Sequence, residues 1–105
     1  MPFQPTSPDR VPRIFKYSCG HLDRGILTAK VQGPRLEQIL DIQEQGDRLV
    51  LWATVDVAQM GYQHTIQIYS AYTGDPPAGK SWSYFKTIQS ESDGLVYHLY
   101  IKNDW

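Results

Sequence analysis

The sequence predicts an all-β fold, mainly antiparallel, in which about seven short strands form a small sandwich or a partly open barrel with at most one short helix. Apolar and polar residues alternate with a period of two along most of the chain, as expected where one face of a strand is buried. The alternating runs are rich in β-branched and aromatic residues, which favour strands. Clusters of Gly, Pro, Asp and Ser separate the runs at short intervals.

The expected strands follow one another from residue 13 to residue 102. The strongest of them reads RLVLWATVD and has apolar residues on both faces, which is typical of a central strand covered on both sides. The polar, glycine-containing segment SCGHLDRG is expected to form a loop after the first strand. The predicted strands are residues 13–17, 26–32, 38–44, 48–56, 63–72, 82–89 and 94–102.

Residues 35–45, RLEQILDIQEQ, fit two structures. A helix here would begin after Pro34 and end at Gly46, with one face formed by Leu36, Ile39, Leu40 and Gln43. A strand would turn at QGD directly into the next strand, with one side formed by Leu40, Ile42 and Glu44. We favour a strand over residues 38–44.

Length and composition predict one domain that occupies residues 13–105. The chain has 105 residues, of which 41% are hydrophobic and 20% charged, as in soluble globular proteins. Residues 1–12 hold four of the seven prolines and are expected to form a flexible arm. A net charge of -1, with Lys and Arg scattered singly, argues against nucleic acid as a partner. No apolar run or leader suggests a membrane or export, and the single cysteine fits the cytoplasm.

Residues 74–81, GDPPAGKS, match the Walker A pattern of phosphate-binding loops. Such a loop must lead into a helix whose N-terminus faces the phosphate, but the residues after Ser81 have the alternation of a strand. Pro76 and Pro77 also lack the N–H groups that would bind the anion. We therefore interpret the match as chance and the segment as a polar hairpin loop. As an alternative, the loop binds a phosphate-bearing ligand without hydrolysing it.

Cysteine and histidine residues suggest no metal site and no catalytic site. A structural zinc site uses paired ligands at short spacings, and Cys19 with His21 is the sole such pair. We therefore expect no metal, no cofactor and no enzymatic activity, with Cys19 and His21 in a surface loop and His98 half-exposed on a sheet. A Cys–His hydrolase, in which His64 or His98 approaches Cys19, is the alternative.

Aromatic residues are concentrated in the second half of the chain, and the predicted strands have too few faces to bury all of them. Tyr72 and Trp82 bracket the glycine-rich loop, an arrangement suited to stacking on a ring or anchoring a partner protein. Packing in the core or at its rim is the alternative. The predicted ligand- or partner-binding residues are Tyr72, Gly74, Asp75, Gly79, Lys80, Ser81 and Trp82.

Several separated segments carry a resemblance to a known family, namely IFKY, ILDIQEQGDRLVLWATVD, YFKTIQ and GLVYHLY. Over residues 13–101 the chain resembles a family of small, uncharacterised bacteriophage proteins, chiefly through the W-A-x-V-D stretch ending at Asp56 and the L-V-x-H stretch ending at His98. The resemblance implies phage origin and a compact β fold, without an established activity. That family's Gly-Thr-Gly-His loop is Tyr72–Thr73–Gly74–Asp75 here, so no role of its histidine is carried over.

Small phage proteins often act by binding, and many counter bacterial defence. The resemblance therefore implies a non-catalytic binding protein that inhibits a host antiviral defence system in the cytoplasm of the infected bacterium. Its partner would be a host defence protein or a small anionic, nucleotide-like signal. A structural or accessory phage protein is the alternative. An open sheet with spare Tyr and Trp side chains also predicts a homodimer or a higher homo-oligomer.

Overall fold

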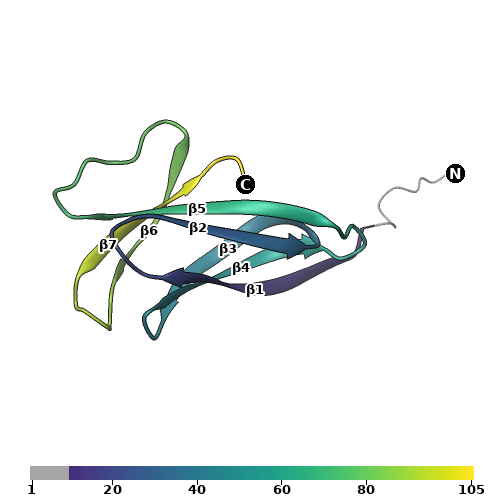
Figure 1. Ribbon diagram of the computed structural model, residues 1–105, viewed down its shortest axis with the longest axis horizontal. Helices are drawn as coiled ribbons and strands as arrows, with labels where there is room; N and C mark the ends of the chain where they lie inside the picture. The colour runs from purple at the N-terminus through teal and green to yellow at the C-terminus, as the bar shows by residue number, and fades with distance from the viewer. Residues whose placement is uncertain (1–9) are drawn as a thin grey trace, which may run out of the picture.

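In the computed structural model, which describes residues 10–105, seven strands form two antiparallel sheets, and this part of the chain contains no helix (Figure 1). The three-stranded sheet has the order β1 (Pro12–His21), β4 (Arg48–Asp56), β3 (Arg35–Gln45). The four-stranded sheet has the order β2 (Gly25–Gly33), β5 (Tyr62–Tyr72), β7 (Val96–Lys102), β6 (Trp82–Gln89). The predicted all-β, antiparallel sandwich is thereby confirmed, and the two sheets are not closed into a barrel.

The core lies between the two sheets because period-two alternation places one apolar face of each sheet inward. On β4 the inward residues Leu49, Leu51, Ala53 and Val55 are fully buried. The opposing sheet contributes Ile66 and Ile68 of β5 together with Tyr97, Leu99 and Ile101 of β7. On the outer face of β4 Val50 is buried, but Trp52 and Thr54 are half-exposed, so the expectation of cover on both sides is met in full on the inner side only.

Strand β3 contains two bulges, which explain why its sequence also resembled a helix. The register with β4 shifts between Leu36 and Gln38 and again between Ile39 and Asp41. Each bulge adds one residue to the strand, so the side chains that face the core are Leu36, Ile39 and Ile42, three residues apart. Leu40, which we expected beside Ile42, is 42% exposed instead. The preference for a strand is confirmed, and the strand begins at Arg35.

Strand β1 is longer than predicted. Residues 18–21, which we expected in a loop, continue the strand past a bulge at Cys19, where the register with β4 shifts between Ser18 and Gly20. The bulge turns Cys19 into the core, so the expectation of a surface-loop cysteine is wrong. The polar and glycine residues that suggested a loop are those that accommodate the bulge. At the other end of the chain, β7 begins at Val96 rather than at residue 94.

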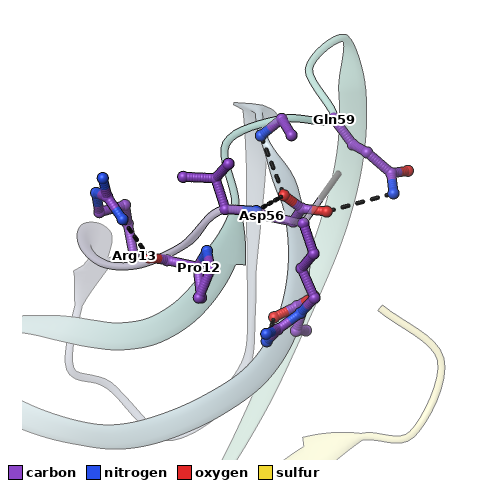
Figure 2. A network of polar contacts seen from close by, with 8 residues as sticks. Pro12, Arg13, Asp56 and Gln59 are labelled. Carbon is purple, nitrogen blue, oxygen red and sulfur yellow. Dashed lines mark hydrogen bonds and ion pairs between the residues drawn. The ribbon is translucent and has the colours of Figure 1, made fainter. Parts of the chain in front are cut away.

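The buried carboxylate of Asp56 anchors the start of β1 (Figure 2). It accepts hydrogen bonds from the amides of Val11 at 2.8 Å and Ala58 at 3.0 Å, and from the side chain of Gln59 at 3.3 Å. The amide of Val11 leads among the causes that hold the pKa of Asp56 below its usual value. The last residues of the predicted arm, 10–12, are therefore attached to the fold, and residues 1–9 lie outside the described part of the chain.

Polar contacts join the two sheets along β3. The ammonium of Lys86 on β6 lies 2.8 Å from a carboxylate oxygen of Asp41 and donates to the carbonyl of Ile42 at 2.9 Å. Glu44 accepts hydrogen bonds from the hydroxyl of Ser90 at 2.7 Å, the hydroxyl of Ser92 at 2.8 Å and the amide of Glu91 at 2.9 Å. The acidic turn between β6 and β7 is thus tied to the edge of the other sheet.

Among residues 10–105, no helix is long and apolar enough to cross a membrane.

Candidate functional site

Residues 73–81, here called the crossover loop, connect two strands that are not neighbours in the sheet. Strand β7 lies between β5 and β6 and is antiparallel to both. The end of β5 at Tyr72 lies beside Tyr97 near the start of β7, whereas β6 starts at Trp82 beside Lys102 at the end of β7. The loop must therefore return along the length of β7, and it does so on the outer face of the sheet (Figure 1). The expected hairpin loop is thus wrong, because hairpins join neighbouring strands.

One end of the crossover loop is held by Asp75. Its carboxylate accepts hydrogen bonds from the amide of Tyr72 at 2.9 Å and from two nitrogens of Arg24 at 2.9 and 2.6 Å. The guanidinium of Arg24 also lies 5.1 Å from the ring centre of Tyr72, at cation–π distance. The Tyr72 amide, and after it the hydrogen bond from Arg24, lower the pKa of Asp75 below its ordinary value. Asp75 therefore shapes the loop, and its charge is already compensated.

The other end of the crossover loop is held by Asn103. The amide of Asn103 donates to the carbonyl of Ser81 at 2.9 Å, and its side chain donates to the carbonyl of Lys80 at 3.4 Å. In the middle of the loop the hydroxyl of Tyr69 donates to the carbonyl of Pro76 at 3.3 Å. These contacts direct backbone carbonyl groups toward the sheet.

This geometry differs from that of a Walker A loop, in which converging N–H groups and a helix N-terminus bind the phosphate. Strand β6 begins directly after Ser81, as the alternation predicted. The amides of Asp75 and Trp82 donate to carbonyl groups within the chain, those of Tyr72 and Gly79, and the two prolines have no N–H to offer. The residues that match the phosphate-loop pattern therefore form a crossover connection, whose backbone groups make hydrogen bonds within the chain.

A hollow of about 260 Å³ lies between the crossover loop and the sheet. Its floor contains His98 and Tyr100 of β7, and Pro76 and Pro77 form part of its wall. Both ring nitrogens of His98 contact hydroxyl groups, Nε2 that of Thr73 at 2.8 Å and Nδ1 that of Thr87 at 2.9 Å. A hydroxyl group can donate or accept, so this pair orients the imidazole in either neutral tautomer.

Four aromatic side chains extend across the outer face of the same sheet and are here called the outer aromatic row. Tyr100 occupies the centre, with ring centres 5.9 Å from Tyr69 on β5 and 5.7 Å from Tyr84 on β6. Trp82 lies 6.0 Å from Tyr69, and the ammonium of Lys102 lies 5.8 Å from the Trp82 ring. Tyr84 is 57% exposed. The row therefore presents flat apolar rings with polar tips to the solvent.

The structure divides the predicted site residues into two groups. Gly74 and Asp75 line the hollow together with Tyr72, but the Tyr72 ring packs at the rim of the core, 5.3 Å from the ring centre of Tyr97, as the alternative expected. Trp82 belongs to the outer aromatic row, and the remaining three residues lie at the far end of the crossover loop, away from the hollow. The residues that the prediction missed are His98, Tyr100, Tyr69 and Tyr84, which reach this face because of the strand order. The alternation of His98 and Tyr100 with the inward residues Tyr97 and Leu99 was a signal for an outer face, although not for a site.

The cysteine and histidine residues do not gather into one site. Cys19 lies in the core, where burial raises the pKa of its thiol to about 11, opposite to what a nucleophile needs. His64 accepts a hydrogen bond from the amide of Leu36 at 3.0 Å, and His98 lies half-exposed on the outer face, as expected. Within residues 10–105, no three His, Cys, Asp or Glu side chains are grouped so that they could hold a metal ion.

Comparison with known proteins identifies the family. A two-sheet β-sandwich with a crossover loop over an aromatic outer face defines a class of small β domain rather than an activity. The chain belongs to the family described as Domain of unknown function (DUF7352), whose model matches residues 12–104. No curated protein and no solved structure matches the chain. The match confirms that the chain belongs to a family without an assigned function, and the phage origin implied by the resemblance stays a prediction.

Proposed function

We propose that this chain is a non-catalytic binding protein, encoded by a bacteriophage, that inhibits a host antiviral defence system by docking its outer aromatic row onto a defence protein. The outer aromatic row supports this proposal most strongly, because Tyr84 is exposed, the other three rings are half-exposed, and ordered Tyr and Trp rings are typical anchors of protein interfaces. The phage origin and the defence target rest on the resemblance of residues 13–101 to small phage proteins.

The size of the hollow favours a protein partner over a nucleotide-like signal. Pockets for ligands of drug size usually have about 300–1,000 Å³ and enclose most of the ligand. The hollow has about 260 Å³ and is bounded on one side by a single loop. It is better suited to one inserted side chain of a partner, placed against Tyr100 and His98. Sequestration of a small anion is the second candidate, and Lys80, which is exposed at the end of the loop, is the cation nearest in sequence.

An infection assay tests the proposal. Bacteria that carry a panel of antiviral defence systems would express the chain and then be infected with a phage that each system restricts. We expect restored plaque formation against at least one system, and loss of that effect in Tyr84→Ser and Trp82→Ser. Ile14→Ser is the matched control, because Ile14 is 66% exposed on the outer face of the other sheet. Equal loss in the control, or no restoration with any system, would contradict the proposal.

The two candidate modes are separated by what the purified protein carries. Docking predicts a stable complex with the defence protein that Tyr84→Ser abolishes and Lys80→Ala leaves intact. Sequestration predicts that heat denaturation releases an unmodified nucleotide-like molecule, detectable by mass spectrometry and lost in Lys80→Ala. A released molecule without a protein complex would replace the docking mode by the second one.

A further inference from the structure

The four edge strands of the sandwich differ in how well they are protected against pairing with another strand. Proteins protect an exposed edge with prolines, bulges or charges. β1 begins with Pro12 and contains the bulge at Cys19. β3 contains two bulges, and β6 contains one between Tyr84 and Lys86. β2, by contrast, pairs with β5 from Gly25 to Gly33 without a register shift, contains no proline, and carries one charge, the exposed Lys30.

The free edge of β2 is regular and apolar along its inner side. Its inward residues Leu27 and Val31 are only partly buried, although both pack against the core, and Ala29 between them is buried. Among the strands of residues 10–105, β5 is the single neighbour of β2 in the sheet. The N–H and C=O groups on the other side of the strand therefore have no strand to pair with, and part of the core is open to solvent beside them.

The geometry points to a second copy of this chain as the partner of this edge, paired antiparallel about a two-fold axis at Ala29. The sequence GILTAKVQG complements itself in this register. Ala29 faces Ala29 of the partner subunit, Leu27 faces Val31 of the partner subunit, and each Gly25 faces Gly33 of the partner subunit. All nine residues of β2 pair in this way, whereas a shift of the axis to a neighbouring residue leaves part of the strand unpaired.

The charges and faces of β2 agree with this register. Residues opposite each other in an antiparallel pair point to the same face of the sheet, so inward apolar residues meet inward apolar residues. On the outer side Lys30 faces Thr28 of the partner subunit, and no like charges lie directly opposite each other. The two four-stranded sheets become one continuous sheet of eight strands. Their outer aromatic rows then lie on the same face of this sheet. The proposed function does not depend on this pairing.

A charge test on the outer side examines the register without disturbing the core. Thr28 is exposed, and Thr28→Lys places two lysines opposite each other on each side of the two-fold axis. We expect the dissociation constant of the dimer, measured by sedimentation, to rise about tenfold, and Thr28→Glu to lower it by a similar factor. Thr65→Lys is the matched control, since Thr65 lies opposite Lys30 on β5, one strand away from the interface.

Cysteine cross-linking in a Cys19→Ala background examines the same pairing by distance. Opposite residues in an antiparallel pair have Cα atoms about 4.5–5.5 Å apart, within the range of a disulfide, whereas diagonal neighbours lie about 7–8 Å apart. Thr28→Cys and Lys30→Cys should therefore not cross-link to themselves. A mixture of the two proteins should form the disulfide under mild oxidation.

Other results of these experiments would overturn the inference. A wild-type chain that stays monomeric in light scattering at millimolar concentration has no such interface. A dimer whose dissociation constant ignores both Thr28 substitutions, or that cross-links Thr28→Cys to itself as readily as to Lys30→Cys, uses another surface or register. Tyr84→Ser separates the two proposals. The proposed function expects this variant to lose infection rescue, and this inference expects the dissociation constant of its dimer to stay unchanged.

Discussion

Substitution of Gly20 by alanine probes the contact between β1 and β2, where the two sheets approach each other. Gly20 has a φ of +131°, a backbone conformation that favours glycine. A Cβ atom at this position would lie 2.9 Å from Cδ1 of Leu27. Gly33 offers a matched comparison, because its φ of +141° is similar and no atom lies within 4 Å of the corresponding Cβ. The two substitutions therefore share the backbone strain and differ in the contact.

The expected magnitudes follow from these two terms. Backbone strain of a non-glycine residue costs about 1–3 kcal/mol, and this is the whole cost expected for Gly33→Ala. The new Cβ meets only the end of the half-buried Leu27 side chain, which can shift, so this contact adds about 1 kcal/mol and Gly20→Ala should lower the free energy of unfolding by about 2–4 kcal/mol. The free energy of unfolding of a domain of this size is about 5–15 kcal/mol. We expect Gly20→Ala to fold and to unfold at a lower urea concentration than Gly33→Ala.

Urea denaturation followed by tryptophan fluorescence measures the difference, with Leu27→Ala as a third variant. Leu27→Ala removes the clashing methyl groups, so its cost and that of Gly20→Ala should not add in the double variant. The double variant should be more stable than the sum of the two single costs predicts by about 1 kcal/mol. Equal unfolding midpoints for Gly20→Ala and Gly33→Ala, or simple additivity with Leu27→Ala, would refute the close approach of β1 to β2.

Two further predictions concern titratable groups. Burial raises the pKa of the Cys19 thiol to about 11 from 9.0. The thiol should therefore react with a disulfide reagent at pH 8 about a hundredfold more slowly than in the denatured chain. Equal rates in the two states would contradict the burial of Cys19. Burial of Glu44 by itself raises its pKa, but hydrogen bonds from Ser90 and Ser92 and from the Glu91 amide outweigh it and leave the pKa below the usual value. A lowered pKa contributes stability above the ordinary carboxylate pKa of about 4, and this contribution is lost as the pH falls through the folded-state pKa. Glu44→Gln should therefore lower the melting temperature at pH 7 and flatten its decline below pH 4 in calorimetry, whereas a decline as steep as in the wild type would show that Glu44 is not involved.

Much of the fold could be predicted from alternation alone, and the misreadings of β1 and β3 have a common physical cause. Residues 48–56 and 82–89 were predicted with the bounds that the structure shows, because one face of each strand meets the core. In β3 and β1, bulges interrupt the alternation. A bulge shifts every later side chain to the opposite face, so Leu36, Ile39 and Ile42 acquire a spacing close to that of a helix. Local pattern alone could not distinguish this from a helix.

The candidate site was only partly predictable, because the alternation of residues within each strand does not show the order of the strands in the sheet. The prediction placed the site around the ends of residues 73–81, where Tyr72 and Trp82 are close in sequence. The insertion of β7 between β5 and β6 moves these two residues to opposite ends of a strand and places His98 and Tyr100 beneath the loop. One available signal was the length of the connection, since the loop is much longer than a tight hairpin turn and contains two consecutive prolines.

The separation of core and outer face has a consequence for any test of function. The core cluster consists of inward residues, and the outer aromatic row lies on the other side of the same strands. Tyr84 contributes one cross-strand ring pair and a hydroxyl contact with Thr87 at 2.7 Å, both of them largely exposed. Cross-strand pairs contribute about 0.2–1 kcal/mol, so Tyr84→Ser should lower the free energy of unfolding by no more than about 1 kcal/mol. The proposed partner binding can thus be tested without unfolding the domain. If Tyr84→Ser instead destabilises the protein as much as a core substitution does, the ring is part of the fold and its exposure is no sign of an interface.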